Sequence, residues 1–181
     1  MKAKILIIVG AVLVILVGAF LYLNNRNRTL SPPGETSATA GDLTVKVTYS
    51  RPSVRDRLIF GEAEEGALLP YGVYWRLGAN EPTDLEVSKG FMFGDAEMEA
   101  GKYVIYAIPR KGEMELRLSS DLRMWGYSEP DYTKDLATTL VRVNPADHTE
   151  QFTIEAVADG SNINLVFSWS THTWTLPIEG R

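Results

Sequence analysis

Apolar and polar residues alternate with a period of two along much of the chain after residue 42, and this pattern constrains the fold more than any other feature. The run 43–49 (L-T-V-K-V-T-Y) is the clearest case, and runs 152–156 and 163–169 repeat it. A period of two is typical of a β-strand with one buried face. Further segments of strand-like composition lie between turn residues and cover 57–60, 73–76, 85–88, 102–108, 114–118, 139–143 and 172–176.

About ten short strands of this kind predict an all-β domain over residues 42–181, built as an antiparallel β-sandwich or an open barrel. No stretch of this segment has the length and periodicity of an amphipathic helix, and only residues 131–137 are expected to form a short helical turn. Because no change in composition divides the segment, we expect a single domain there.

The N-terminal segment has a different character, because residues 5–23 contain no charged side chain. As a helix they would span about 28 Å, close to the hydrocarbon thickness of a bilayer. A head of residues 1–4 precedes the run, and Arg26 and Arg28 follow it. The sequence therefore predicts a transmembrane helix over residues 5–23 and a membrane as its partner.

The alternative to a retained helix is a cleavable signal peptide, which would release a secreted protein. The apolar run is longer than is usual for a signal peptide, and the residues after it are a poor cleavage site. The chain has no cysteine, which excludes attachment of a lipid to a cysteine. We expect a single-pass protein of the cell membrane with its C-terminal domain on the exported side, periplasmic or extracellular. Residues 24–41, with two prolines and small polar residues, are expected to form a flexible linker.

Charge bears on the partners of the predicted domain. The full chain has a net charge of −5, and its first 40 residues hold four basic side chains and one acidic one, so residues 41–181 carry −8. A domain this acidic lacks the basic footprint of a nucleic-acid-binding protein, so no nucleic acid is expected. The same net charge predicts that the domain is repelled by an anionic membrane surface.

Metal and cofactor chemistry find little support in the sequence. The two histidines, His148 and His172, lie far apart, and motifs for acyl transfer, nucleotide binding and calcium binding are absent. His148 is expected in a solvated turn. His172 shares its parity with apolar residues of the last predicted strand, so we expect it to be half-buried near a strand end. No metal and no cofactor are predicted.

An arginine-rich segment at residues 49–82 carries the most distinctive chemistry. It includes R-P-S at 51–53 and W-R-L-G-A-N-E at 75–81. With these motifs, residues 43–178 resemble domain-of-unknown-function family 2911, a set of bacterial proteins without an assigned activity. The resemblance implies an exported all-β domain, and it implies that Arg51 and Arg55 lie near one another.

Guanidinium groups bind carboxylates and phosphates through paired hydrogen bonds, so these arginines are candidates for binding an anionic ligand. The alternative is that they pair with Asp56, Glu81 or Glu86 and hold loops to the domain, while Trp75 fills the core. Exposed aromatic residues in a second loop are also typical of a carbohydrate site. The predicted ligand-binding residues are Arg51, Arg55, Arg76, Asn80, Glu81, Trp125 and Tyr127.

The function predicted from the sequence is a membrane-anchored, exported binding module for a small anionic or carbohydrate ligand or for an envelope component. The alternative is a hydrolase, for example one directed at glycans, that uses Glu81 and a second carboxylate such as Asp131 as acid and base. Acidic residues are common in this chain, so the binding module is the preferred interpretation.

Overall fold

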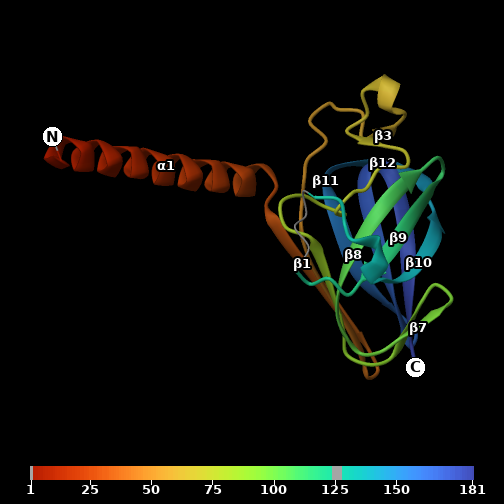
Figure 1. The fold of residues 1–181 in the computed structure, drawn as a ribbon. Helices are drawn as coiled ribbons and strands as arrows, with labels where there is room; N and C mark the ends of the chain where they lie inside the picture. The colour runs from red at the N-terminus through yellow and green to blue at the C-terminus, as the bar shows by residue number, and fades with distance from the viewer. Residues whose placement is uncertain (1, 124–127) are drawn as a thin grey trace.

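The computed structural model describes residues 2–123 and 128–181 and consists of one long helix followed by β structure (Figure 1). The helix, α1 (Lys2–Leu30), projects away from the rest of the molecule. It is longer than the predicted span 5–23, because no proline occurs before Pro32. The helical segment Ile8–Leu30 is long and apolar enough to cross a membrane. A helix of this kind fits either a membrane anchor or a signal peptide.

Two antiparallel sheets form the domain, in agreement with the predicted all-β fold. The first has the order β1 (Pro33–Ala40), β2 (Leu43–Ser50), β5 (Thr83–Val87), β8 (Gly101–Arg110), β9 (Glu113–Ser119), β10 (Asp135–Arg142). The second has the order β11 (Asn144–Asp159), β12 (Asn162–Gly180), β6 (Phe91–Phe93), β7 (Ala96–Met98). A short parallel pair, β3 (Phe60–Gly61) and β4 (Leu69–Pro70), lies at one end.

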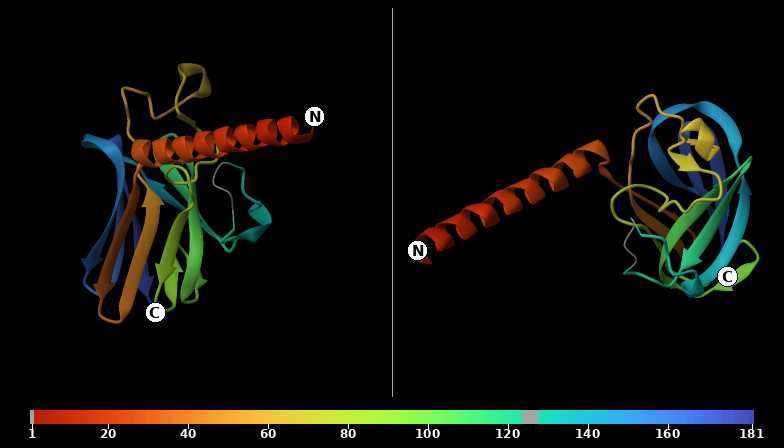
Figure 2. Two further views of the ribbon diagram at one scale, coloured as in Figure 1. Left: turned by 90° about the vertical axis from the view of Figure 1, so that its left-hand side faces the viewer. Right: turned by 45° about the horizontal axis from the view of Figure 1, so that its top comes forward.

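The core lies between the two sheets, in a sandwich-like arrangement (Figure 2). Trp75 is only 3% exposed and stacks on Trp169 at 5.5 Å between ring centroids, which confirms that it fills the core. Phe167 and Trp174 of β12 stack at 5.4 Å. Burying a large side chain contributes roughly 2–3 kcal/mol. This aromatic cluster is therefore a major source of stability.

Residues 33–40, expected to belong to a flexible linker, instead form β1. This strand pairs with β2 in continuous register from Pro33 opposite Ser50 to Ala40 opposite Leu43. The backbone N–H of Ala156 in β11 donates to Oγ1 of Thr36 (3.0 Å), which links β1 to the second sheet. The small polar side chains suit an edge strand with one face toward solvent.

Some other predicted elements also differ from the structure. Segment 57–60 contributes only Phe60 to a strand, and segment 73–76 contributes a single bridge between Trp75 and Ala107. The last two predicted strands are one strand, β12, bent where Ser170 has a left-handed φ of 54°. The expected helical turn at 131–137 is a short 3-10 helix, η2 (Tyr132–Lys134), which leads into β10.

Candidate functional site

The W-R-L-G-A-N-E segment folds into a tight turn that closes the core. Trp75 Nε1 donates to the carbonyl of Gly78 (3.0 Å), and Thr83 Oγ1 donates to the carbonyl of Leu77 (2.7 Å). Leu77 and Asn80 have left-handed φ values of 53° and 57°, which the two hydrogen bonds help to hold. The turn buries Trp75 and Leu77 in the core, so much of this motif is used by the fold itself.

Three of the predicted ligand-binding residues, Arg55, Arg76 and Asn80, line one cavity of about 440 Å³, which we call the arginine groove. It lies where the C-terminal end of α1 meets the loops around residues 52–57 and 75–80. Arg55 Nη2 donates to the carbonyl of Leu30 (3.2 Å), and Asn80 Nδ2 donates to the carbonyl of Ser31 (3.3 Å). Arg76 Nη1 donates to the carbonyl of Asn80 (3.0 Å). The bonds from Arg55 and Asn80 dock the end of α1 and the residue after it onto the domain.

Arg51 is not among the residues that line the groove. Its Nη2 donates to Thr153 Oγ1 of β11 (3.1 Å), and its aliphatic stem passes close to Gly34 of β1. Arg51 therefore bridges the two sheets at the edge formed by β1. The predicted aromatic partners Trp125 and Tyr127 lie outside the residues that the structure describes.

The carboxylates proposed for acid–base chemistry have local partners. Glu81 Oε1 pairs with Arg28 Nη2 of α1 at 2.6 Å, with both side chains about half exposed, and such a pair contributes about 1 kcal/mol or less. Glu86, which was considered as a partner for the arginines, instead pairs with Lys102. Asp131 accepts hydrogen bonds from the Oγ1 and N–H of Thr133 (2.6 and 3.1 Å), which lower the pKa of its carboxyl group and cap η2. None of these contacts is typical of a general acid.

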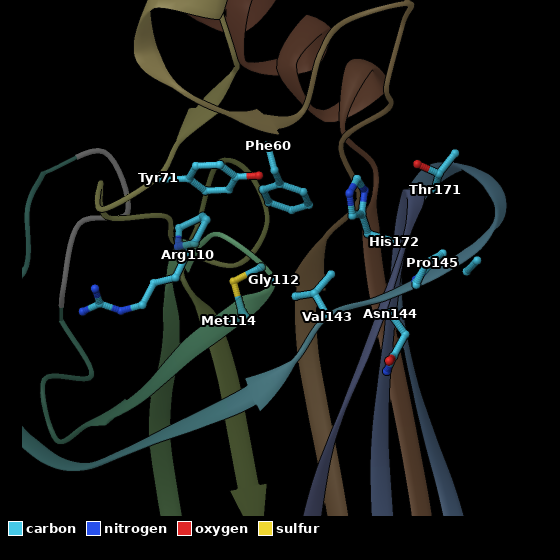
Figure 3. A pocket seen from close by; sticks show the side chains of 12 residues that line it. Phe60, Tyr71, Arg110, Gly112, Met114, Val143, Asn144, Pro145, Thr171 and His172 are labelled. Atoms are coloured by element: carbon cyan, nitrogen blue, oxygen red, sulfur yellow. The ribbon is translucent and has the colours of Figure 1, made fainter.

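A second cavity, of about 410 Å³, lies near the β3–β4 pair and is called the end pocket here (Figure 3). Both sheets contribute to its wall, with Met114 from β9 and His172 from β12. Phe60 and Tyr71 lie on one side, while the side chain of Arg110 points away from the cavity. Most of the wall is therefore apolar.

His172 is a titratable side chain in the wall of the end pocket. It is half-buried, as its parity in the sequence predicts, and its ring lies edge-on to Phe60 at 5.4 Å between centroids. Its Nδ1 is buried and has no hydrogen-bond partner among the described residues. Burial lowers the pKa of His172, because desolvation disfavours the charged ring. The imidazole is therefore neutral at neutral pH.

A charged network on the outer face of the first sheet was not predicted from the sequence. Glu115 is held between Arg110 and Arg117, with Arg110 Nε donating at 2.6 Å and Arg117 Nε donating at 2.6 Å. Arg117 also pairs with Asp135 (2.9 Å), which accepts a hydrogen bond from the Tyr106 hydroxyl (2.6 Å).

The network shifts the pKa of two of its side chains, Glu115 and Tyr106. Burial raises the pKa of Glu115, but hydrogen bonds from the two arginines outweigh burial, and the pKa lies below its ordinary value. Burial and the hydrogen bond to Asp135 raise the pKa of Tyr106 far above its ordinary value. The uninterrupted apolar run 103–109 is the sequence feature that could have indicated this network, because such a run is typical of a strand covered on both faces. Because its charges are mutually satisfied, we interpret the network as structural.

The geometry defines a class of protein: a β-domain of two antiparallel sheets attached to an apolar N-terminal helix. Within residues 2–123 and 128–181, no group of three or more His, Asp or Glu residues is placed to hold a metal ion. A family model described as "Protein of unknown function (DUF2911)" matches residues 31–178, and the chain belongs to this family. No curated protein and no solved structure matches the chain. The family match includes β1, in agreement with its place in the sheet.

Proposed function

We propose that this protein is a membrane-anchored binding module, with its β-domain on the exported side of the membrane and a small organic ligand in the end pocket. The observation that carries the proposal is the end pocket itself. Its volume of about 410 Å³ and its mostly apolar wall with a few polar groups are typical of small-molecule sites.

The side chains around the end pocket favour a neutral ligand with an aromatic or aliphatic ring. Phe60, Tyr71 and Met114 offer apolar and aromatic surface. His172, neutral at neutral pH, and Thr171 offer hydrogen-bonding groups. Arg110 directs its side chain away from the cavity and pairs with Glu115. An uncharged ligand with one or two polar groups fits this environment.

Retention of α1 in the membrane is supported by its exposed apolar surface. Large hydrophobic side chains from Ile8 to Leu23 are about half or more exposed, and none of them packs on the domain. Such a surface is unfavourable in water and favourable in lipid. The position of the folded β-domain after the helix supports an exported domain.

Methyl groups of methionine provide a test of the end pocket. We expect that, among neutral aromatic fragments added to the full chain in lipid nanodiscs, some will shift the NMR signal of the Met114 methyl group, because this side chain lines the pocket. The signals of Met92 and Met98, at the other end of the domain, serve as internal controls.

Two tryptophan substitutions in the same strand make the test specific. Ala146→Trp fills the end pocket and should abolish the Met114 shifts. Ala158→Trp, at the exposed far end of β11, should leave them unchanged. The proposal would be wrong if no fragment moved the Met114 signal, or if the shifts survived Ala146→Trp.

A further inference from the structure

We infer that the arginine groove binds the phosphate groups of anionic lipids in the membrane that holds α1. This inference rests on the membrane insertion of α1 proposed above and is independent of the end pocket. It assigns a ligand class to Arg55 and Arg57 and explains why basic residues gather at this place in an acidic domain.

The position of the groove along α1 places it close to the lipid headgroups. The apolar part of α1 ends near Leu23, and the groove begins at Asn27 and Leu30. Four to seven residues of helix span about 6–10 Å, and the headgroup layer on each side of a bilayer is about 5–8 Å deep. The groove therefore lies beside the headgroups when residues 5–23 occupy the hydrocarbon. Figure 1 shows that the domain begins directly at this end of the helix.

The side chains that line the groove and its surroundings give this face a positive charge. The described residues that line the groove include three arginines and no acidic residue. The adjoining turns of α1 add Arg26 and Arg28. Carboxylates near these arginines include Asp56 in the sequence, Glu81, which pairs with Arg28, and Glu150, which accepts a hydrogen bond from the backbone N–H of Arg55. This face is locally basic although residues 41–181 carry −8, so the net charge of the domain does not describe the charge of this face.

The hydrogen bonds of Arg55 and Arg57 leave their positive charges available to a ligand. Arg57 donates from Nε and Nη2 to the carbonyls of Val54 (2.9 Å) and Ser53 (2.6 Å), and Arg55 donates to the carbonyl of Leu30. Carbonyls are neutral, so these bonds orient the guanidinium groups without cancelling their charge. Each guanidinium keeps further N–H groups that suit a phosphate oxygen. An arginine beside an anionic membrane strengthens binding by about fivefold.

The test uses the full chain in nanodiscs of phosphatidylcholine, with or without an equal part of phosphatidylglycerol. Unfolding is followed by tryptophan fluorescence, because Trp75, Trp169 and Trp174 are buried in the core. We expect the native domain to melt about 5 °C higher in the discs that contain phosphatidylglycerol. Added salt should reduce this difference.

The double variant Arg55→Gln/Arg57→Gln should lose the difference between the two kinds of disc. Each variant is compared with itself in the two lipids, so a general loss of stability cancels. Arg142→Gln, on β10 across the domain from α1, is the matched control and should keep the difference. A melting temperature that is independent of lipid charge, or a difference that survives the double substitution, would overturn the inference.

Inorganic phosphate added to the phosphatidylcholine discs separates the two sources of the anion. If it reproduced the full stabilisation, the groove would bind free phosphate and the lipid assignment would be wrong. Failure of the chain to enter the discs would instead disprove the insertion of α1. Size-exclusion chromatography reports that outcome before any melting experiment.

Discussion

A chain that begins at residue 42 will melt about 10 °C lower than one that begins at residue 31, or will not fold, because it lacks β1. This strand pairs with β2 along its whole length and contacts β11 through Thr36. Its loss also removes Gly34 from beneath Arg51 and leaves β2 as an open edge. We estimate a loss of about 3 kcal/mol or more from the hydrogen bonds and the burial.

Thermal unfolding of the two shortened chains, followed by circular dichroism, checks this expectation. Both lack α1, so the comparison isolates the strand. Equal melting temperatures would mean that residues 33–40 act as a linker after all, and would remove β1 from the domain.

The second large effect is expected for Gly78→Ala. Gly78 has a φ of 157°, and a Cβ atom built there would lie 2.9 Å from the backbone oxygen of Ser50. That oxygen belongs to the last residue of β2, which pairs with Pro33 of β1, so moving it away would disturb this end of the β1–β2 ladder. We expect destabilisation of about 3 kcal/mol or more, since steric overlap adds to the backbone strain.

Gly160→Ala is the matched control for Gly78→Ala. Gly160 also has a positive φ, of 62°, but a Cβ atom there would meet nothing within 4 Å. Its substitution should cost only the conformational strain, about 1 kcal/mol. If urea denaturation gave the same loss of stability for both variants, the close approach of Gly78 to Ser50 would not matter to the fold.

Much of the fold could be predicted because alternation is a local property of the chain. The pattern of 43–49 reappears in β2, and Trp75 lies in the core as expected. Strand β1 could not be predicted in this way, because P-G-E-T-S-A-T-A has little apolar content and becomes a strand only by pairing with β2. Its partner, not its composition, determines its conformation.

The candidate sites were harder to predict, because they depend on which side chains a turn brings together. The family resemblance implied that Arg51 and Arg55 lie near one another, yet Arg51 reaches across β1 to Thr153 while Arg55 faces the end of α1. The end pocket is assembled from segments between Phe60 and His172 that are distant in the sequence. No local pattern indicates such a cavity, although the parity of His172 did indicate its half-buried position.

Native mass spectrometry of the protein released from alkali-washed membranes tests most directly whether it is an anchored binding module. We predict a chain that still contains α1 and carries a small organic molecule, and we predict that Ala146→Trp removes this molecule while Ala158→Trp retains it. A soluble chain that lacks α1 would contradict the anchor. A membrane-bound chain without a bound molecule, or one that keeps the molecule in Ala146→Trp, would contradict the assignment of the end pocket as the ligand site.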